Sequence, residues 1–200
     1  MTGQCSPSLD DVTFVVLDLE TTGTSPDRSA ITEIGAVKYR AGECIGTLAT
    51  LVDPGVPLSP VVIELTGITD VMLHVAPRVE SVLPSVIEFL RGAVVVGHNV
   101  GFDRAFLDAA LVAAGRAPLD HPLVDTLPLA RRLLADEVPN HRLATLALYL
   151  RATHQPCHRA LADALATADV LHALLERLGT WGVVELADLL AFPQDQRATA

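Results

Sequence analysis

The sequence predicts an α/β domain in which a mixed five-stranded sheet carries helices on both faces. Near the N-terminus, three apolar and β-branched segments follow one another, and the turn Ala41–Glu43 joins the last two as a hairpin. They predict an antiparallel meander of strands at residues 13–19, 30–40 and 44–52. Downstream, helical patterns alternate with short apolar runs at residues 93–97 and 123–124, an alternation typical of α/β folds.

Apolar residues at helical spacing, together with capping residues, predict the helices. Ser59 and Pro60 suit the N-cap and first position of one helix, and Gly115 suits the end of another. The predicted helices are residues 60–65, 79–91 and 103–114, one after a cap at Asp125, one from a cap at Asn140 to about Leu150, and residues 161–178.

Length and composition indicate one domain. Two hundred residues are enough for a sizeable core, and half of them are apolar. We expect a loose N-terminal tail over residues 1–11, the folded domain over residues 12–178, and a short C-terminal extension over residues 179–200. No apolar run reaches the roughly 18 residues that span a bilayer, and residues 1–11 do not resemble a secretion signal. A membrane is therefore not an expected partner.

Cysteine usage and charge narrow the class further. Cys5, Cys44 and Cys157 are odd in number and widely spaced, which is typical of reduced thiols in a cytoplasmic protein. The net charge of −10 argues against an extended electrostatic grip on duplex nucleic acid. It is compatible with an enzyme that holds a few nucleotides through bound cations, because these offset part of the local negative field.

The first apolar strand ends in two carboxylates, Asp18 and Glu20, followed by Thr21, Thr22 and Gly23. Side chains alternate along a strand, so Asp18 and Glu20 project from the same face. Adjacent carboxylates at the end of a buried strand repel each other, and a cation between them removes that penalty. An all-oxygen ligand set favours Mg²⁺ or Mn²⁺ over zinc. Taken alone, the pattern is equally typical of a strand that ends in a solvated acidic turn.

Three later residues are candidates to complete a cation-dependent site with Asp18 and Glu20. Asp103 follows His98, Asn99 and Phe102 at the start of a predicted helix, where an aspartate is also common as an N-cap. Asp163 lies in the first turn of the last helix, where it would also complement the helix dipole. His158 stands five residues before Asp163, in a polar loop. Each signal is weak alone, and the order and spacing of all of them carry the argument.

Together these motifs resemble the DEDD exonuclease superfamily in its histidine (DEDDh, DnaQ-like) subclass, the family of the proofreading epsilon subunit of bacterial DNA polymerase III. The resemblance covers residues 13–178 and implies a ribonuclease H-like fold. The sister subclass has tyrosine four residues before the last aspartate, where this chain has Arg159. The chain also looks like the exonuclease domain at the N-terminus of longer actinobacterial proteins, which carry a second, excision-repair-like nuclease domain.

The resemblance implies a role for each motif residue. Two Mg²⁺ or Mn²⁺ ions would be held by four carboxylates, namely Asp18, Glu20, Asp103 and Asp163. His158 would act as the base that deprotonates the attacking water, since its ordinary pKa of about 6.5 suits proton transfer near neutrality. Substrate contacts are expected from Thr21 and Thr22 at the 3′ end, from Ile68 against the terminal base, and from Asn99, which would otherwise brace its loop.

The implied function is a metal-dependent 3′–5′ exonuclease that releases nucleoside 5′-monophosphates from single-stranded DNA, in replication proofreading or repair. An exoribonuclease of the same fold, similar to RNase T or oligoribonuclease, stays open because no motif here separates RNA from DNA. A non-catalytic nucleic-acid-binding module would be expected to have lost a metal ligand, yet all five catalytic positions are present. A polymerase or repair complex is left open as a further partner.

Overall fold

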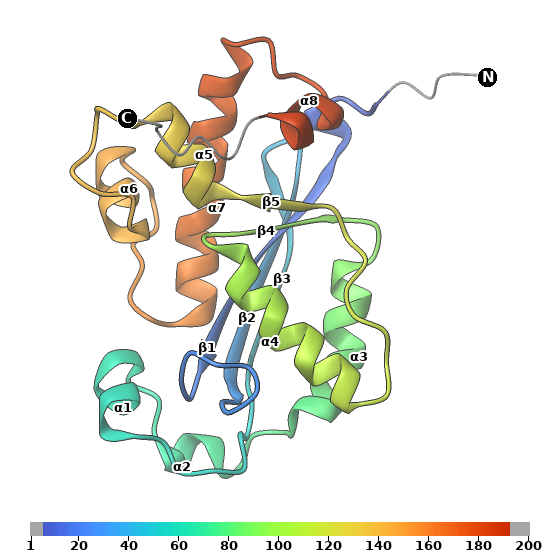
Figure 1. Cartoon of the computed structure of the whole chain (residues 1–200), viewed down its shortest axis with the longest axis vertical. Coiled ribbons are helices and arrows are strands. Elements are labelled where there is room, and N and C mark those ends of the chain that lie inside the picture. Colours follow the sequence, from blue (N-terminus) through green and yellow to red (C-terminus); the bar gives the residue numbers. More distant parts are fainter. Residues whose placement is uncertain (1–5, 193–200) are drawn as a thin grey trace.

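A five-stranded sheet in the order β3-β2-β1-β4-β5 forms the centre of the domain (Figure 1). The computed structural model describes residues 6–192. The strands are β1 (Thr13–Thr21), β2 (Ile31–Arg40), β3 (Glu43–Leu51), β4 (Val94–Gly97) and β5 (Leu123–Asp125). β1, β2 and β3 are antiparallel neighbours, whereas β4 pairs in parallel with both β1 and β5. The predicted mixed sheet and its antiparallel meander are confirmed.

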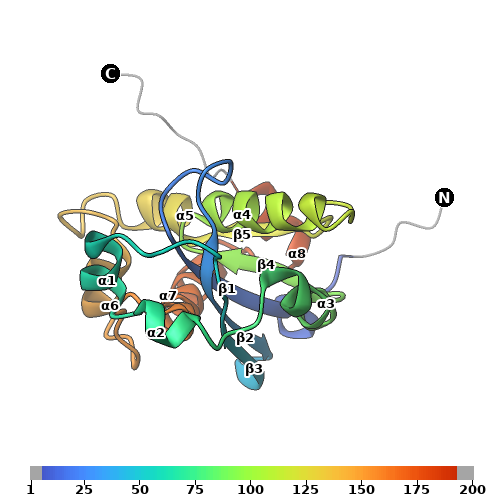
Figure 2. The same ribbon diagram turned by 90° about the horizontal axis from the view of Figure 1, so that it is seen from below.

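Helices cover both faces of the sheet (Figures 1 and 2). One face packs against α5, α6, α7 and α8, and the other against α3 and α4. The helices are α1 (Pro60–Thr66), α2 (Asp70–Leu73), α3 (Val79–Leu90), α4 (Val100–Ala113), α5 (Thr126–Leu133), α6 (Leu143–Tyr149), α7 (Ala160–Gly179) and α8 (Leu186–Ala191). α7 makes the most extensive helix contacts with the sheet, across β1 and β2.

The alternation of side chains along β1 divides the core in two. Phe14 and Val16 point to the α7 face, whereas Val15, Leu17 and Leu19 point to the α3 and α4 face, and all five are at most 6% exposed. Burying this much apolar surface on both sides fixes the register of the strand. Asp18 and Glu20 continue the even-numbered series and therefore belong to the α7 face.

The segment between β3 and α3 forms a small satellite beside the sheet. Ser59 caps α1 as predicted, accepting a hydrogen bond from the Val62 N–H. The short helix α2 was not predicted; it is capped by the Thr69 hydroxyl. Leu58, Ile68 and Leu73 form a separate apolar cluster under α1 and α2.

The two ends of the described chain lie together. Leu9–Asp11 forms a 3₁₀ turn, Ser8 bridges to Glu185, and the Leu9 N–H donates to the Val184 carbonyl at 2.9 Å. Residues 6–11 therefore pack against the C-terminal extension, where the sequence analysis expected a loose tail. Residues 1–5 and 193–200 lie outside the described residues. Among the helices that the structure describes, none is long and apolar enough to cross a membrane.

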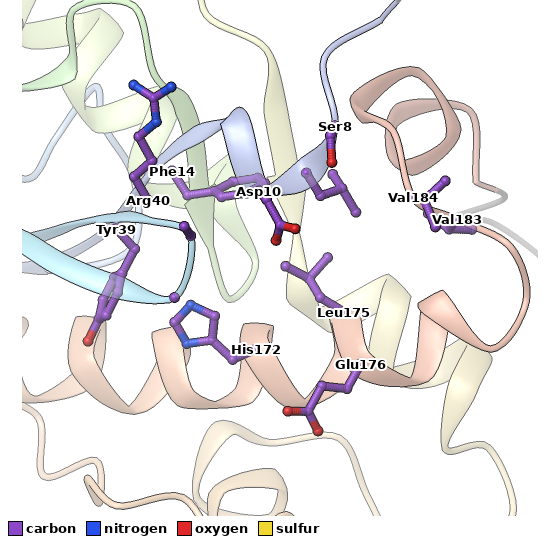
Figure 3. A pocket seen from close by; sticks show the side chains of 13 residues that line it. Ser8, Asp10, Phe14, Tyr39, Arg40, His172, Leu175, Glu176, Val183 and Val184 are labelled. Carbon is purple, nitrogen blue, oxygen red and sulfur yellow. The ribbon is translucent and has the colours of Figure 1, made fainter.

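A cavity of about 590 Å³ opens beside this junction (Figure 3). Tyr39 and His172 meet there edge to face, with ring centroids 4.8 Å apart. Burial lowers the pKa of His172, which favours the neutral imidazole. None of the nine predicted site residues lines this cavity.

Candidate active site

The site forms where the amino end of α7 crosses the carboxyl end of β1. Gly35 on β2 is the register partner of Asp18, and it explains the close approach. A Cβ atom added to Gly35 would lie 2.2 Å from the Ala160 carbonyl carbon and 2.2 Å from the Leu161 nitrogen. Only glycine therefore lets the first turn of α7 rest on β2, and this contact brings Asp163 to the carboxylates of β1.

Glu20, His158 and Asp163 come together at this crossing. Each offers one ligand atom, and these atoms all lie within 4.8 Å of one another. Glu20 and Asp163 are 9% and 8% exposed, whereas His158 is exposed. His158 has a φ of +58°, in the left-handed region that a histidine rarely occupies. Asp163 also accepts a hydrogen bond of 2.8 Å from the Cys157 N–H, which ties the preceding loop to the helix.

Asp103 enters from α4, past the end of β4. Its Oδ1 accepts a hydrogen bond of 3.0 Å from the Leu19 N–H, across 84 residues of sequence. The parallel pairing of β1 with β4 stops at Val16, so the carboxylate takes over as acceptor further along β1. The predicted start of this helix at Asp103 was wrong: α4 begins at Val100 with Asn99 as N-cap, and Asp103 is the fourth helical residue.

The pKa values of the three innermost carboxyls are raised. Burial raises the pKa of Asp18 well above its ordinary value, and the charges of Asp103, Asp163 and Glu20 add to the effect. Burial, followed by Asp163 and Glu33, raises the pKa of Glu20 to about 7. Burial raises the pKa of Asp103 to about 8, although backbone N–H groups counteract it. The cluster therefore resists holding its full negative charge unless a cation compensates it.

The donor set fits divalent cations. Among the described residues, neither the Asp18 nor the Glu20 carboxylate accepts a hydrogen bond from the protein, so their oxygens are free to bind a ligand. Carboxylate oxygens are the donors that Mg²⁺ and Mn²⁺ prefer. A positive ion among them would offset both the cost of burial and the mutual repulsion that raise the three pKa values.

A family model for exonucleases of the RNase T type matches residues 15–171 of this chain. The chain belongs to this exonuclease family. The match includes all five predicted catalytic positions, and the resemblance to DEDD exonucleases is confirmed. Enzymes of this family depend on divalent metal ions, in agreement with the acidic group at the crossing of β1 and α7.

Relatives of this exonuclease domain are parts of longer proteins. A bifunctional exonuclease/endonuclease protein of Mycobacterium tuberculosis is 48% identical over 92% of this chain, which spans 30% of that protein. A PolC-type DNA polymerase III of Caldanaerobacter subterraneus is 39% identical over 94% of the chain, which spans 13% of that polymerase.

Solved exonucleases share the fold. Exonuclease X in complex with 5′-overhanging duplex DNA superimposes with a TM-score of 0.65 and 26% identity, over 83% of this chain and 93% of that one. Escherichia coli Exonuclease I in complex with an oligonucleotide gives a TM-score of 0.75 at 20% identity, over 85% of this chain and 42% of that one. The second likeness supports the ribonuclease H-like fold alone.

The predicted substrate-contacting residues differ in their availability. The Thr21 hydroxyl donates to the Gly23 carbonyl at 2.6 Å, and the Thr22 hydroxyl accepts from the Ala30 N–H at 3.0 Å. Both oxygens keep further hydrogen-bonding capacity. Asn99 is exposed with a φ of +70°; its backbone N–H donates to Asp125 at 2.8 Å and its carbonyl accepts from the Phe102 N–H at 2.9 Å, whereas its carboxamide makes no hydrogen bond among the described residues. Ile68 is 0% exposed within its own cluster, so its side chain is not available to a base in this structure.

Sequence reasoning missed Glu33. It lies directly opposite Glu20 on β2, is 6% exposed, and accepts two hydrogen bonds from Arg159. The signal was a carboxylate between apolar residues in the first half of a largely buried strand. Arg159, which stands where the sister subclass has tyrosine, is paired with Glu33. His98 is structural, because both of its ring nitrogens are occupied, by Thr126 and by the His141 carbonyl.

A cleft of about 780 Å³ leads away from the cluster toward α5 and α6. His158 and Asp163 form its edge at the site. Arg131 and Arg142 also line it, and both are exposed. The cleft therefore joins the acidic cluster to a more basic surface.

Proposed function

We propose that this domain is a metal-dependent 3′–5′ exonuclease that removes nucleoside 5′-monophosphates from single-stranded DNA. The observation that carries the proposal is the convergence of Asp18, Glu20, Asp103, Asp163 and His158 from three distant segments at one end of β1. When bound there, two Mg²⁺ or Mn²⁺ ions supply an activated water and stabilise charge on the phosphorus and on the leaving oxygen.

The side chains divide the work between holding ions and moving a proton. The four carboxylates would hold the ions, and their partial burial would keep the ions in a low-dielectric environment, where charges act more strongly than in bulk water. His158 is the one exposed member of its group, beside Glu20 and Asp163, so its imidazole can accept a proton from the attacking water and release it to solvent.

The substrate would approach from two sides of the cluster. Thr21 and Thr22 follow Glu20 directly, and their hydroxyls would bind the free 3′ hydroxyl of the terminal nucleotide. Asn99 keeps a free carboxamide for a sugar or phosphate contact. The contact of Ile68 with the terminal base requires α1 and α2 to open, since its side chain is buried.

DNA is favoured over RNA by the relatives. Two of them are described as PolC-type DNA polymerase III and as an exonuclease bound to duplex DNA. We therefore propose a role in replication proofreading or repair, with a polymerase or repair complex as partner. The 12–178 domain boundaries and a cytoplasmic location stay predictions from the sequence.

A time course on 5′-labelled single strands tests the proposal. DNA and RNA of the same sequence are incubated with Mg²⁺, Mn²⁺ or EDTA, with circular DNA and a 3′-phosphorylated strand as controls. We expect one-nucleotide shortening of the DNA from its 3′ end with either metal, none in EDTA, slower degradation of the blocked strand and intact circles.

Three results would contradict the proposal in different places. Full activity in EDTA would exclude the metal-dependent mechanism. Nicked circles or loss of the 5′ label would exclude the 3′–5′ direction. Faster degradation of RNA than of DNA would reassign the domain as an exoribonuclease.

A further inference from the structure

His158 is exposed, yet its backbone is held on both sides. Before it, the Cys157 N–H donates to Asp163 at 2.8 Å. After it, Arg159 and Ala160 are bonded to Glu33. A left-handed φ of +58° is unfavourable for histidine, so it persists only where the surrounding contacts enforce it. These two attachments are the contacts that enforce it.

Glu33 makes the stronger of the two attachments. Its Oε1 accepts from Arg159 Nη2 at 2.7 Å, and its Oε2 accepts from Arg159 Nε at 3.1 Å and from the Ala160 N–H at 2.9 Å. The guanidinium fork and the first free N–H of α7 thus bind one carboxylate. Glu33 is 6% exposed and sits on β2, opposite Glu20, so it links the loop to a rigid strand.

We propose that Glu33 is a positioning residue for the reaction: through Arg159 and Ala160 it holds the His158 imidazole over Glu20 and Asp163. The inference rests on the proposed function, because it takes His158 as the base. Glu33 itself touches neither the substrate nor the reacting atoms. Without it, the loop can relax to a negative φ at His158, and the imidazole turns away from the cluster.

A double-mutant cycle tests this inference in the full chain. Glu33→Gln keeps the shape and an acceptor for the Ala160 N–H but breaks the paired bonds to Arg159. His158→Ala alone should lower kcat roughly 10²–10⁴-fold, the usual range for a lost general base. Glu33→Gln alone should lower kcat roughly 10–100-fold, as is typical of supporting residues around a metal site, with little change in KM. In the His158→Ala background, Glu33→Gln should change kcat less than about 2-fold.

Two matched variants sharpen the cycle. Asp169→Ala removes another anchor of the same loop, the bonds of Asp169 Oδ2 with the His154 N–H and ring nitrogen at 2.8 and 3.0 Å. These bonds hold the loop at His154, four residues before His158, so kcat should change less than about 3-fold. Arg159→Lys keeps the positive charge with a single point contact, so its kcat should fall between those of the wild type and Glu33→Gln. All assays use saturating Mg²⁺ for each variant, because Glu33 also lies near the carboxylate of Glu20.

Equal losses of kcat from Glu33→Gln in both backgrounds would overturn the inference, since they would indicate a structural or purely electrostatic role. Unchanged kcat in Glu33→Gln would overturn it as well. If His158→Ala keeps near-full turnover, the base assignment of the proposed function fails. The positioning inference is then judged by the His158 imidazole signal in NMR, which should shift in Glu33→Gln while the His98 signal stays. An unmoved His158 signal would overturn it.

Discussion

Acidic side chains in two regions of this molecule experience opposite electrostatic environments. At the surface between α5 and α6, Glu137 accepts hydrogen bonds from Arg177 and from the Tyr149 hydroxyl, and these bonds lower its pKa. At the crossing of β1 and α7, burial raises the pKa of Glu20 to about 7 and that of Asp103 to about 8. The negative charge stabilises the folded protein in the first region and destabilises it in the second.

The difference lies in what surrounds each carboxylate. Glu137 is beside a cation and water, so the ionised form is favoured. Asp18, Glu20 and Asp103 are removed from water by burial and lie near other carboxylates, while Arg159 is paired with Glu33. Such unfavourable clustering persists in proteins where the charges serve a function, and we propose cation binding as that function here. Variants that neutralise one carboxylate at a time test whether the two regions differ in this way.

The largest expected effect is on activity, from Asp103→Asn. Loss of a metal-binding charge removes several kcal/mol of transition-state stabilisation, so kcat should fall by roughly 10³-fold or more. In EDTA the same variant should be more stable than the wild type, because Asn can still accept from the Leu19 N–H while the cost of burying a charge, and its repulsion by nearby carboxylates, are gone. Activity assays and thermal melts of the same preparations measure both effects.

Glu137→Gln is the matched control, since it also neutralises one carboxylate. Its activity should stay within about 2-fold of the wild type, because surface positions away from the site contribute little. If Asp103→Asn melted below the wild type in EDTA at pH 8, the buried charge of Asp103 would not limit the stability of the fold.

The next effect concerns pH. The folded pKa of Asp103, about 8, lies above its ordinary value of 3.8, so the folded state binds more protons than the unfolded state and loses stability as pH rises between these values. Well below pH 3.8, Asp103 is protonated in both the folded and the unfolded state, so Asp103 and Asn are electrically alike. The melting temperature of Asp103→Asn minus that of the wild type, measured in EDTA, should therefore be near zero at about pH 3, grow as pH rises, and reach at least about 3 °C at pH 8.

Mg²⁺ should close this gap. A ligand at 100 times its Kd stabilises the state that binds it by about 2.7 kcal/mol, or roughly 5–10 °C for a domain of this size. The wild type should gain that much at pH 8 and less at pH 5, where protons compete with the ion, whereas Asp103→Asn should gain little at either pH. A gain independent of pH and of Asp103 would place the ion elsewhere.

How much of this could be predicted from sequence depends on whether a signal is local. The strands and the helix caps at Ser59 and Asp125 depend on residues that are close in sequence, and the structure confirms them. Asp18 and Glu20 could be assigned to one face because strand alternation is strict. The start of α4 was missed because Asn99 caps it in a left-handed conformation without a side-chain bond, which leaves no capping pattern to recognise.

The remaining features depend on contacts between distant segments. Glu33 and Arg159 are 126 residues apart, and no local pattern indicates that they pair. From the sequence alone, Gly35 is a residue that weakens a strand. Only the packing of α7 against β2 shows why glycine is needed there. The burial of Ile68 under α1 and α2 likewise follows from packing, since an apolar residue after a glycine suits both a core and a binding surface.

The smallest predicted effect comes from the paired region. Glu137→Gln removes an ion pair whose two side chains are each 37% exposed, so solvent screens most of its energy. The melting temperature at pH 7 should fall by no more than about 3 °C. The pKa of Glu137 is lowered from 4.5, so its contribution is present above that pH and is lost as pH falls below it. The melting-temperature difference between Glu137→Gln and the wild type should therefore shrink in acid. It should also shrink in 1 M salt, which screens exposed ion pairs. Its sign is negative, whereas that of Asp103→Asn is positive. A difference that grew in acid would mean that the Glu137 anion is not stabilised by its neighbours. The contrast between Glu137 and the buried carboxylates would then be wrong for Glu137.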